Sequence, residues 1–423
     1  MSFVYYEKLD QGIDTRCLSN GLTVKVVPKA GFTKSLAYFA TNFGSIHRSF
    51  RLDGREYELP QGVAHFLEHK MFELPQRDVT AEFAALGGNV NAFTSFDMTA
   101  YYFSCTANFM ENLRLLLEFV STPYFTQESV EREYGIIDQE IAMNEDTPDS
   151  REFSALMQKM YRNHPVREEI LGTRESIRQI DADTLYLCHR AFYTPANMVL
   201  CVVGDVDADQ VAALAEEVLG TDYHAPAEKL RHWQEDLTCP AEPAELTMDV
   251  AMPTFQMGFK CAPAGRGVAA LRTDVVGYLA AETLFGESSP LFLELYEQGI
   301  IDSSFGGSFE TIDGCAILSC GGDGERPDLV RQAVLSRAAD LAEKGLEEAA
   351  FQRLKRGAMG RRIRDLDSFD AVCYRLCAYY FLDFEYFDFP AVYADVKKEE
   401  IQAFLEKFVT ENNCAVAITK PIV

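Results

Sequence analysis

Along the first half of the chain, patterns of apolar residues typical of strands alternate with patterns typical of helices. An alternating run typical of a half-buried strand occurs at 21–28, and further strand runs, mostly apolar, occur at 34–41, 99–105 and 198–204. Runs with a helical period occur around 65–69 and at 80–86, 108–121, 127–144, 183–192 and 207–219. We expect residues 91–95 to form a short connection, because a helix-stop signal at Gly87-Gly88 precedes them. Residues 1–220 therefore predict an N-terminal domain of mixed strands and helices.

The hydrophobic periodicity is lost at 221–245, where three prolines punctuate a polar stretch, and we expect a linker there. A similar order then returns, with strands at 255–260, 315–320 and 414–418 and helices at 271–284, 291–297, 328–344 and 346–365. This repetition predicts an α+β fold with a duplicated second half at 246–423. Five of the seven histidines lie before residue 220 and the other two lie in the linker, so a histidine-based metal site would belong to the first half.

Composition and charge narrow the classes of function. With 423 residues, 48% hydrophobic and 25% charged, the chain is typical of a soluble globular protein with two or three domains. Its formal net charge of −26 disfavours nucleic acid and favours basic peptides as partners, although acidity can also serve solubility alone. No apolar run approaches the roughly 20 residues of a membrane span, the N-terminus lacks a signal-peptide pattern, and the 11 cysteines are scattered. We expect a reduced, cytoplasmic protein with no membrane segment and no nucleic-acid partner.

A candidate metal site lies in the sequence His65-Phe66-Leu67-Glu68-His69. Two histidines four residues apart on a helix share one face, so both imidazoles can reach one zinc ion at roughly 2.0–2.1 Å. Glu68 would border the open position of that metal, where it could act as general base on a zinc-bound water. The spacing is the reverse of the H-E-x-x-H metallopeptidase helix, and the inverzincin peptidases carry it.

Two histidines require a third protein ligand, which leaves the fourth position for water. Glu133 and Glu140 are seven residues apart in one helical run and share a face, while Ile136, Ile137 and Ile141 are expected to bury much of the remainder. We expect Glu140 to be the ligand and Glu133 to assist catalysis by orienting a ligand or the water. A solvated helix face is the ordinary alternative for either glutamate, and the pairing with the histidine helix favours the metal site.

Together these residues resemble the pitrilysin/insulinase family of inverted-zincin peptidases. Further similar segments are Gly87-Gly88, Asn91-Ala92-Phe93-Thr94, Thr99-Ala100-Tyr101, Phe192-Tyr193-x-Pro195-x-Asn197-Met198 and Val203-Gly204-Asp205. The resemblance extends over essentially the whole chain, at the size of the short-subunit branch that includes the mitochondrial processing peptidase. Within that branch, the segments 135–141 and 295–302 are most similar to bacterial peptidase-like proteins associated with elongation factor P modification.

The resemblance implies two similar α/β halves, each a mostly antiparallel sheet covered by helices, which form a clamshell around a chamber. It implies a zinc metallo-endopeptidase with one zinc ion per chain, held by His65, His69 and Glu140, and with Glu68 as general base. The segment 91–94 would be an edge strand that pairs with an extended peptide substrate. Because main-chain pairing gives little sequence preference, basic or flexible peptides are the expected substrates.

The sequence departs from the family in its second half. Active members carry an arginine and a tyrosine, seven residues apart, that clamp the substrate, whereas Tyr296 and Asp302 stand at the matching positions here. Two explanations are open: a homologous subunit supplies the clamp in a heterodimer, or the chain acts alone or as a homodimer with narrow activity. The rival function is a non-catalytic or accessory subunit of a heterodimeric processing or modification complex. A structural zinc site is disfavoured, because such sites are usually closed and rich in cysteine.

Overall fold

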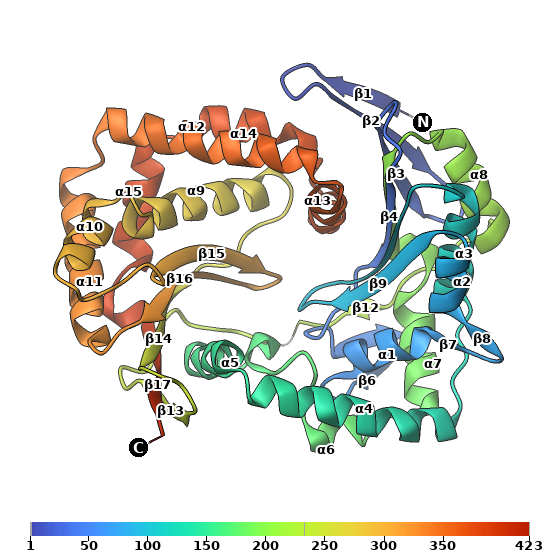
Figure 1. The fold of residues 1–423 in the computed structure, drawn as a ribbon, viewed down its shortest axis with the longest axis horizontal. Helices are drawn as coiled ribbons and strands as arrows, with labels where there is room; N and C mark the ends of the chain where they lie inside the picture. The colour runs from blue at the N-terminus through green and yellow to red at the C-terminus, as the bar shows by residue number, and fades with distance from the viewer. Residues whose placement is uncertain (1, 232, 423) are drawn as a thin grey trace. The chain divides into compact units, whose positions relative to one another are not determined.

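The computed structural model describes residues 2–231 and 233–422, so residues 1, 232 and 423 of the expected domain ranges lie outside it. The described residues divide into two compact units, neither of which is continuous in sequence. Unit 1 consists of 2–141, 169–231 and 363–387, and unit 2 consists of 142–168, 233–362 and 388–422. Each unit is built on its own large β-sheet (Figure 1).

The strands of unit 1 are β1 (Ser2–Tyr6), β2 (Gln11–Cys17), β3 (Thr23–Pro28), β4 (Ser35–Thr41), β5 (Ser49–Leu52), β6 (Arg55–Glu58), β7 (Glu73–Leu74), β8 (Arg77–Asp78), β9 (Gly88–Thr94), β10 (Thr99–Cys105), β11 (Met198–Gly204) and β12 (Glu228–Lys229). Seven of them form one sheet in the order β1-β2-β3-β11-β4-β10-β9. In this sheet β3 and β11 are parallel and the other neighbours are antiparallel. The remaining strands form two small sheets, β12-β5-β6 and β7-β8.

The helices of unit 1 are α1 (Val63–Met71), α2 (Val79–Ala85), α3 (Phe109–Ser121), most of α4 (Gln127–Glu145), α6 (Arg174–Ile177), α7 (Ala182–Phe192), α8 (Ala208–Leu219) and α13 (Phe369–Phe381), with 3-10 turns at Pro195–Asn197, Asp365–Asp367 and Tyr386–Asp388. One face of the large sheet carries the core, where Phe39 of β4 and Phe103 of β10 pack with apolar residues of α1, α3 and α8. The other face is covered by α13, whose Tyr380 hydroxyl donates a 2.9 Å hydrogen bond to Thr23 of β3. Because side chains of a strand alternate between faces, both faces of these central strands are buried and their sequences are apolar almost throughout.

The strands of unit 2 are β13 (Ala244–Met248), β14 (Thr254–Cys261), β15 (Gly306–Ile312), β16 (Cys315–Asp323) and β17 (Cys414–Pro421). Its helices are α5 (Pro148–Met160), α9 (Val268–Phe285), α10 (Pro290–Glu297), most of α12 (Glu348–Arg364), α11 (Pro327–Lys344), α14 (Phe389–Asp395) and α15 (Lys398–Phe408), with 3-10 turns at Pro165–Arg167 and Glu411–Asn413. The sheet order is β13-β17-β14-β16-β15, with β13 and β17 parallel and the other neighbours antiparallel.

The two sheets repeat one topology. In unit 1 the five strands β3-β11-β4-β10-β9 run with one parallel pair followed by three antiparallel pairs. In unit 2 the strands β13-β17-β14-β16-β15 follow the same succession, and in both cases the second strand in space is the last in sequence. By this correspondence β15 of unit 2 matches β9 of unit 1, and α9 has the same position in the topology of unit 2 as α1 has in unit 1. An α+β fold with mixed, mostly antiparallel sheets is therefore confirmed, and the repeated topology supports duplication.

Each sheet has one face covered by a helix from the other half of the sequence. In unit 2 that helix is α5, where buried Glu152 accepts hydrogen bonds from Thr254 and Thr419 at 3.1 and 2.9 Å. In unit 1 it is α13. These two exchanged helices explain why the compact units are discontinuous, whereas the ranges 1–220, 221–245 and 246–423 are consecutive. The consecutive ranges stay a prediction about the two homologous halves.

Several expected elements differ in detail. The connection expected at 91–95 is wrong for residues 91–94, which belong to β9 and pair with β10 along its whole length. The periodicity does not indicate the helices α5, α14 and α15 or the strands β1, β2, β13 and β15. All 11 cysteines are free, and nine of them are buried. Among the residues that the structure describes, no helix is both long enough and apolar enough to cross a membrane.

Candidate metal centre

Two of the three candidate ligands, His65 and His69, lie on α1, a helix whose residues are all buried except His69, which is partly exposed. Its apolar residues Phe66, Leu67 and Met71 are buried, and the polar side chains of His65 and Glu68 are buried as well. The helix begins after Gly62, which has a φ of 85°, and a Cβ there would collide with the carbonyl of Leu171. Buried polar groups need partners. Because they are buried, the polar side chains of His65 and Glu68 therefore need specific partners inside unit 1.

Three side chains from two helices converge as the sequence predicts. The Nε2 atoms of His65 and His69 lie 3.6 and 3.5 Å from the two carboxylate oxygens of Glu140 on α4. The two imidazole rings are 4.5 Å apart between centroids. One nitrogen or oxygen from each of the three residues lies within 4.8 Å of the others. One metal ion could therefore contact all three at once.

The orientation of α4 is set by an apolar stripe. Val130, Ile137 and Ile141 are buried in the core of unit 1, which turns Glu133 and Glu140 toward α1. The expectation that Ile136 is also buried is wrong, because its side chain is 55% exposed. Successive residues of a helix are about 100° apart, so Ile136 and Ile137 cannot both face the same core.

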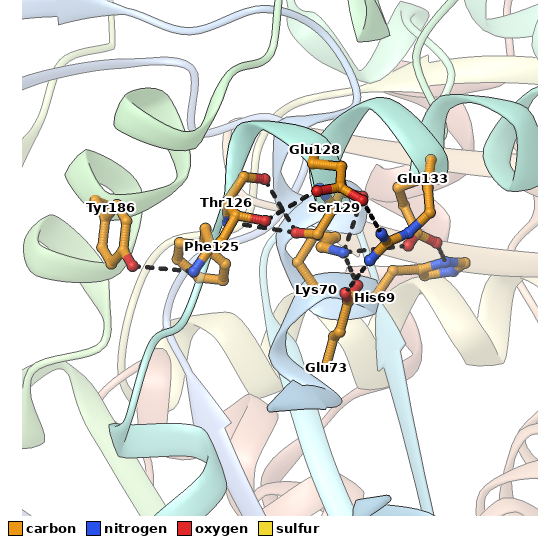
Figure 2. A network of polar contacts seen from close by, with 10 residues as sticks. His69, Lys70, Glu73, Phe125, Thr126, Glu128, Ser129, Glu133 and Tyr186 are labelled. Atoms are coloured by element: carbon orange, nitrogen blue, oxygen red, sulfur yellow. Dashed lines mark hydrogen bonds and ion pairs between the residues drawn. The ribbon is translucent and has the colours of Figure 1, made fainter. Parts of the chain in front are cut away.

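Glu133 contacts the second nitrogen of a candidate ligand. Its Oε1 lies 3.0 Å from Nδ1 of His69. Figure 2 draws this contact. Burial alone would raise the pKa of Glu133, but the hydrogen bond with His69 and the charges of His69 and Lys70 outweigh it, so the pKa is lowered. An ionised Glu133 accepts the Nδ1 proton and leaves the Nε2 lone pair free to bind a metal. Glu133 thus lies where it can hold the His69 ring through Nδ1, and its role in orienting a ligand or the water stays a prediction.

Glu68 occupies the position expected of a general base. It lies on the turn between His65 and His69, and its Oε2 accepts a 2.8 Å hydrogen bond from the hydroxyl of Thr94. Burial raises the pKa of Glu68, and the charge of His65 and the Thr94 hydroxyl offset only part of this. A carboxylate with a raised pKa is a stronger base than an exposed one.

The predicted peptide-binding segment is an edge strand. β9 is the last strand of the large sheet of unit 1, and its Ala92 N–H donates a 2.8 Å hydrogen bond to the side chain of Asn91 rather than to another strand. Phe93 lies on the opposite face from Glu68, with its ring 5.9 Å from that of Tyr374 and 6.3 Å from that of Tyr102. Thr94 ends the strand beside Glu68. An edge strand with an outward N–H is a template for pairing with an extended peptide.

The donor set fits zinc. Two imidazole nitrogens and one carboxylate oxygen are the protein ligands of many catalytic zinc sites, which keep a fourth position open. The residues of the cluster project from two helices, and buried apolar neighbours set the orientation of these helices. His69 has the carboxylate contact typical of a zinc-binding histidine, whereas Nδ1 of His65 is buried and has no hydrogen-bond partner among the described residues.

Two further findings concern residues outside the predicted site. Lys70, which follows His69, has a completely buried side chain in contact with Glu133, and it is not among the residues predicted from the sequence. The available signal was a lysine in a helical run whose residues outside the His65–His69 motif are apolar. In unit 2, Tyr296 is 51% exposed and stacks on Phe292, and Asp302 accepts hydrogen bonds from Ser304.

Comparison with known proteins places this geometry in a family. Residues 54–174 match the model of insulinase (peptidase family M16), and residues 179–358 match the model of the peptidase M16 inactive domain. The "Uncharacterized zinc protease YmfH" of Bacillus subtilis is 37% identical over 99% of both chains. The crystal structure of an M16-like peptidase from Alicyclobacillus acidocaldarius has a TM-score of 0.92 and 36% identity over 97% of this chain and 99% of that one.

More distant structures share the fold. Pitrilysin matches with a TM-score of 0.79 at 17% identity, over 99% of this chain and 46% of pitrilysin. The first family model spans α1 and the whole of α4, and hence His65, His69 and Glu140, whereas the second spans most of the half that has no histidine. The chain therefore belongs to the insulinase family of peptidases, family M16.

Proposed function

We propose that this protein is a zinc-dependent metallo-endopeptidase that hydrolyses peptide bonds in extended peptides. The observation that carries the proposal is the convergence of His65, His69 and Glu140 on one point, with the buried carboxylate of Glu68 on the same helix. Membership of family M16 and the zinc-protease relatives support it.

Each residue of the candidate site has a separate role in the proposed reaction. His65, His69 and Glu140 would hold one zinc ion, which would supply Lewis-acid activation of a water molecule and of the substrate carbonyl. Glu68 accepts a proton from the attacking water and donates it to the leaving amine. Glu133 holds the His69 ring through Nδ1. Thr94 holds the carboxylate of Glu68 in place.

The substrate is an extended segment that adds to the edge of β9. The Ala92 N–H would exchange the side chain of Asn91 for a carbonyl of the peptide. Pairing through the main chain is tolerant of sequence, so charge supplies the selectivity, and a net charge of −26 favours basic or flexible peptides. A clamshell chamber around this edge would limit the size of the substrate, as the family resemblance implies.

A homologous subunit is the partner that the sequence favours. Tyr296 and Asp302 replace the arginine–tyrosine clamp of active family members, and a second subunit could supply that clamp in a heterodimer. The same replacement supports the alternative function, a non-catalytic or accessory subunit of a processing or modification complex. The resemblance to the branch associated with elongation factor P modification favours such a complex.

Hydrolysis of a quenched basic peptide by the purified, zinc-loaded chain tests the proposal. Glu68→Gln is the matched variant, because it removes the base and keeps the three ligands. Cleavage by the wild-type chain that is lost in Glu68→Gln, with one zinc ion bound to each, would support a self-sufficient peptidase. Absence of cleavage despite bound zinc would overturn self-sufficiency, and size-exclusion chromatography with candidate homologous subunits would then test the heterodimer.

A further inference from the structure

Lys70 places a positive charge inside unit 1, directly after a candidate ligand in sequence. Its side chain is 0% exposed and projects from α1, whose other residues are mostly apolar. An ammonium group removed from water is strongly destabilising unless anions and hydrogen-bond acceptors surround it. The groups that contact Lys70 therefore indicate the role of its charge.

Three acceptors surround the Lys70 ammonium group (Figure 2). It forms an ion pair with Glu73 and donates a 3.1 Å hydrogen bond to the carbonyl oxygen of Ser129 on α4. Its Nζ also lies 3.6 Å from Oε2 of Glu133. Glu73 is held in turn by Arg132 of α4, at 2.8 Å.

The contact with Glu133 extends to the candidate metal centre. Glu133 uses its two carboxylate oxygens for two different partners, Oε1 for Nδ1 of His69 at 3.0 Å and Oε2 for Lys70. A carboxylate held at both oxygens has little freedom to rotate. The oxygen that faces His69 is therefore fixed, and so is the direction of the His69 Nε2 lone pair.

We propose that Lys70 is a positioning residue for zinc, which acts by holding Glu133 in the orientation that accepts the Nδ1 proton of His69. The inference rests on the proposed zinc site and adds a residue that acts through Glu133 without touching the metal. The competing role is purely structural: Lys70 could fasten α1 to α4 through Ser129 and Glu73 with no influence on the metal. The two roles differ in whether Lys70 affects zinc affinity at all. Under the proposal it does so, and the effect depends on Glu133.

A double-mutant cycle separates these roles, with the zinc dissociation constant as readout. Competition with a chromophoric chelator would be measured for the wild-type chain, Lys70→Met, Glu133→Gln and the double variant. Loss of an outer partner of a metal ligand typically weakens metal binding by 10- to 100-fold. We expect about tenfold for Lys70→Met and at least tenfold for Glu133→Gln. We expect the double variant to match Glu133→Gln within about threefold, because the two residues act as one unit.

The proposal is overturned if Lys70→Met binds zinc as tightly as the wild-type chain, or if its effect persists undiminished in the Glu133→Gln background. Lys260→Met is the matched control, since Lys260 is also a buried lysine paired with a glutamate, Glu235 at 2.7 Å, but it lies in unit 2. Its zinc affinity should equal that of the wild-type chain.

Thermal unfolding in the presence of EDTA shows which variants fold. If Lys70→Met does not fold, Lys70→Gln replaces it, because the amide keeps a donor for Ser129 and removes the charge. Failure of both variants to fold would assign Lys70 to the fold and overturn the proposal. Zinc affinity is measured without substrate. The result therefore tests the role of Lys70 even if the chain does not hydrolyse peptides.

Discussion

The hydroxyl of Thr94 donates a 2.8 Å hydrogen bond to Oε2 of Glu68. This contact joins the last residue of β9 to the helix that carries the candidate ligands. Thr94 itself is held in the sheet, where it pairs in register with Thr99 of β10. The proposed general base is therefore positioned by the same strand that is proposed to bind the substrate. A peptide seated on β9 would lie within one residue of the group that activates water.

Thr94→Val should impair catalysis with little change in zinc binding. The Thr94 hydroxyl lowers the pKa of Glu68, against the larger effect of burial, so its removal should raise that pKa further. Since the base must be ionised, the acid limb of the kcat/KM profile should move to higher pH. Loss of a hydrogen bond to a charged group, worth about 1.5–3 kcal/mol, predicts a decrease in kcat/KM of roughly ten- to a hundredfold.

A threonine in unit 2 provides the control for this variant. Thr254 donates to buried Glu152 at 3.1 Å, so Thr254→Val removes a similar bond in unit 2. Its pH profile should coincide with that of the wild-type chain. An unchanged acid limb in Thr94→Val would show that the hydroxyl does not act on the base.

Glu140→Gln and Glu133→Gln should differ in metal content. Glu140 faces both Nε2 atoms and is the proposed ligand, whereas Glu133 contacts Nδ1 of His69 and Nζ of Lys70. After dialysis against a weak chelator, we expect Glu133→Gln to retain zinc with an affinity about 10- to 100-fold lower, and Glu140→Gln to lose it. Zinc per chain, measured by atomic spectroscopy, decides between them. Equal retention by both variants would exclude Glu140 as a ligand.

Ala92→Pro should weaken substrate binding selectively. The Ala92 N–H points to the side chain of Asn91 and is available to a substrate carbonyl, and proline has no N–H. Loss of one hydrogen bond of about 1 kcal/mol predicts an increase in KM of roughly fivefold, with a smaller change in kcat. Ala92→Gly keeps the N–H and should retain the wild-type KM. If both variants bind the peptide as the wild-type chain does, the edge of β9 is not the binding strand.

Protonation of His189 should destabilise the fold in mild acid. Burial lowers the pKa of His189 to about 4, and its hydrogen bond with the carbonyl of Val120 only partly offsets this. The unfolded chain binds the proton near pH 6.5 and the folded chain does not, so stability present above pH 6.5 decreases as the pH falls. Between pH 7 and pH 5 this histidine should contribute a loss of about 2 kcal/mol.

Denaturant titrations at several pH values test this prediction. In His189→Asn the dependence on pH should be shallower than in the wild-type chain by that amount, whatever the stability of the variant at pH 7. Parallel curves for the two proteins would show that His189 does not govern the acid sensitivity.

Local sequence determined the elements that carry the chemistry. The spacing of His65 and His69 places both rings on one face of a helix wherever that helix lies, and the seven-residue spacing of Glu133 and Glu140 does the same for α4. Continuous apolar runs likewise predicted the central strands β4, β10 and β11, because strands buried on both faces have few polar positions. These features depend on contacts between near neighbours in sequence.

Tertiary structure decided the features that depend on distant residues. The polar segment 91–94 becomes a strand because β10 supplies hydrogen-bond partners along its length. Lys70 is buried and Thr94 meets Glu68 only because α1, α4 and β9 pack together. Likewise α5 and α13 each cover the sheet of the unit formed mainly by the other half of the sequence. The sequence itself determined which residues can bind a metal, and packing between distant segments determined what surrounds and orients them.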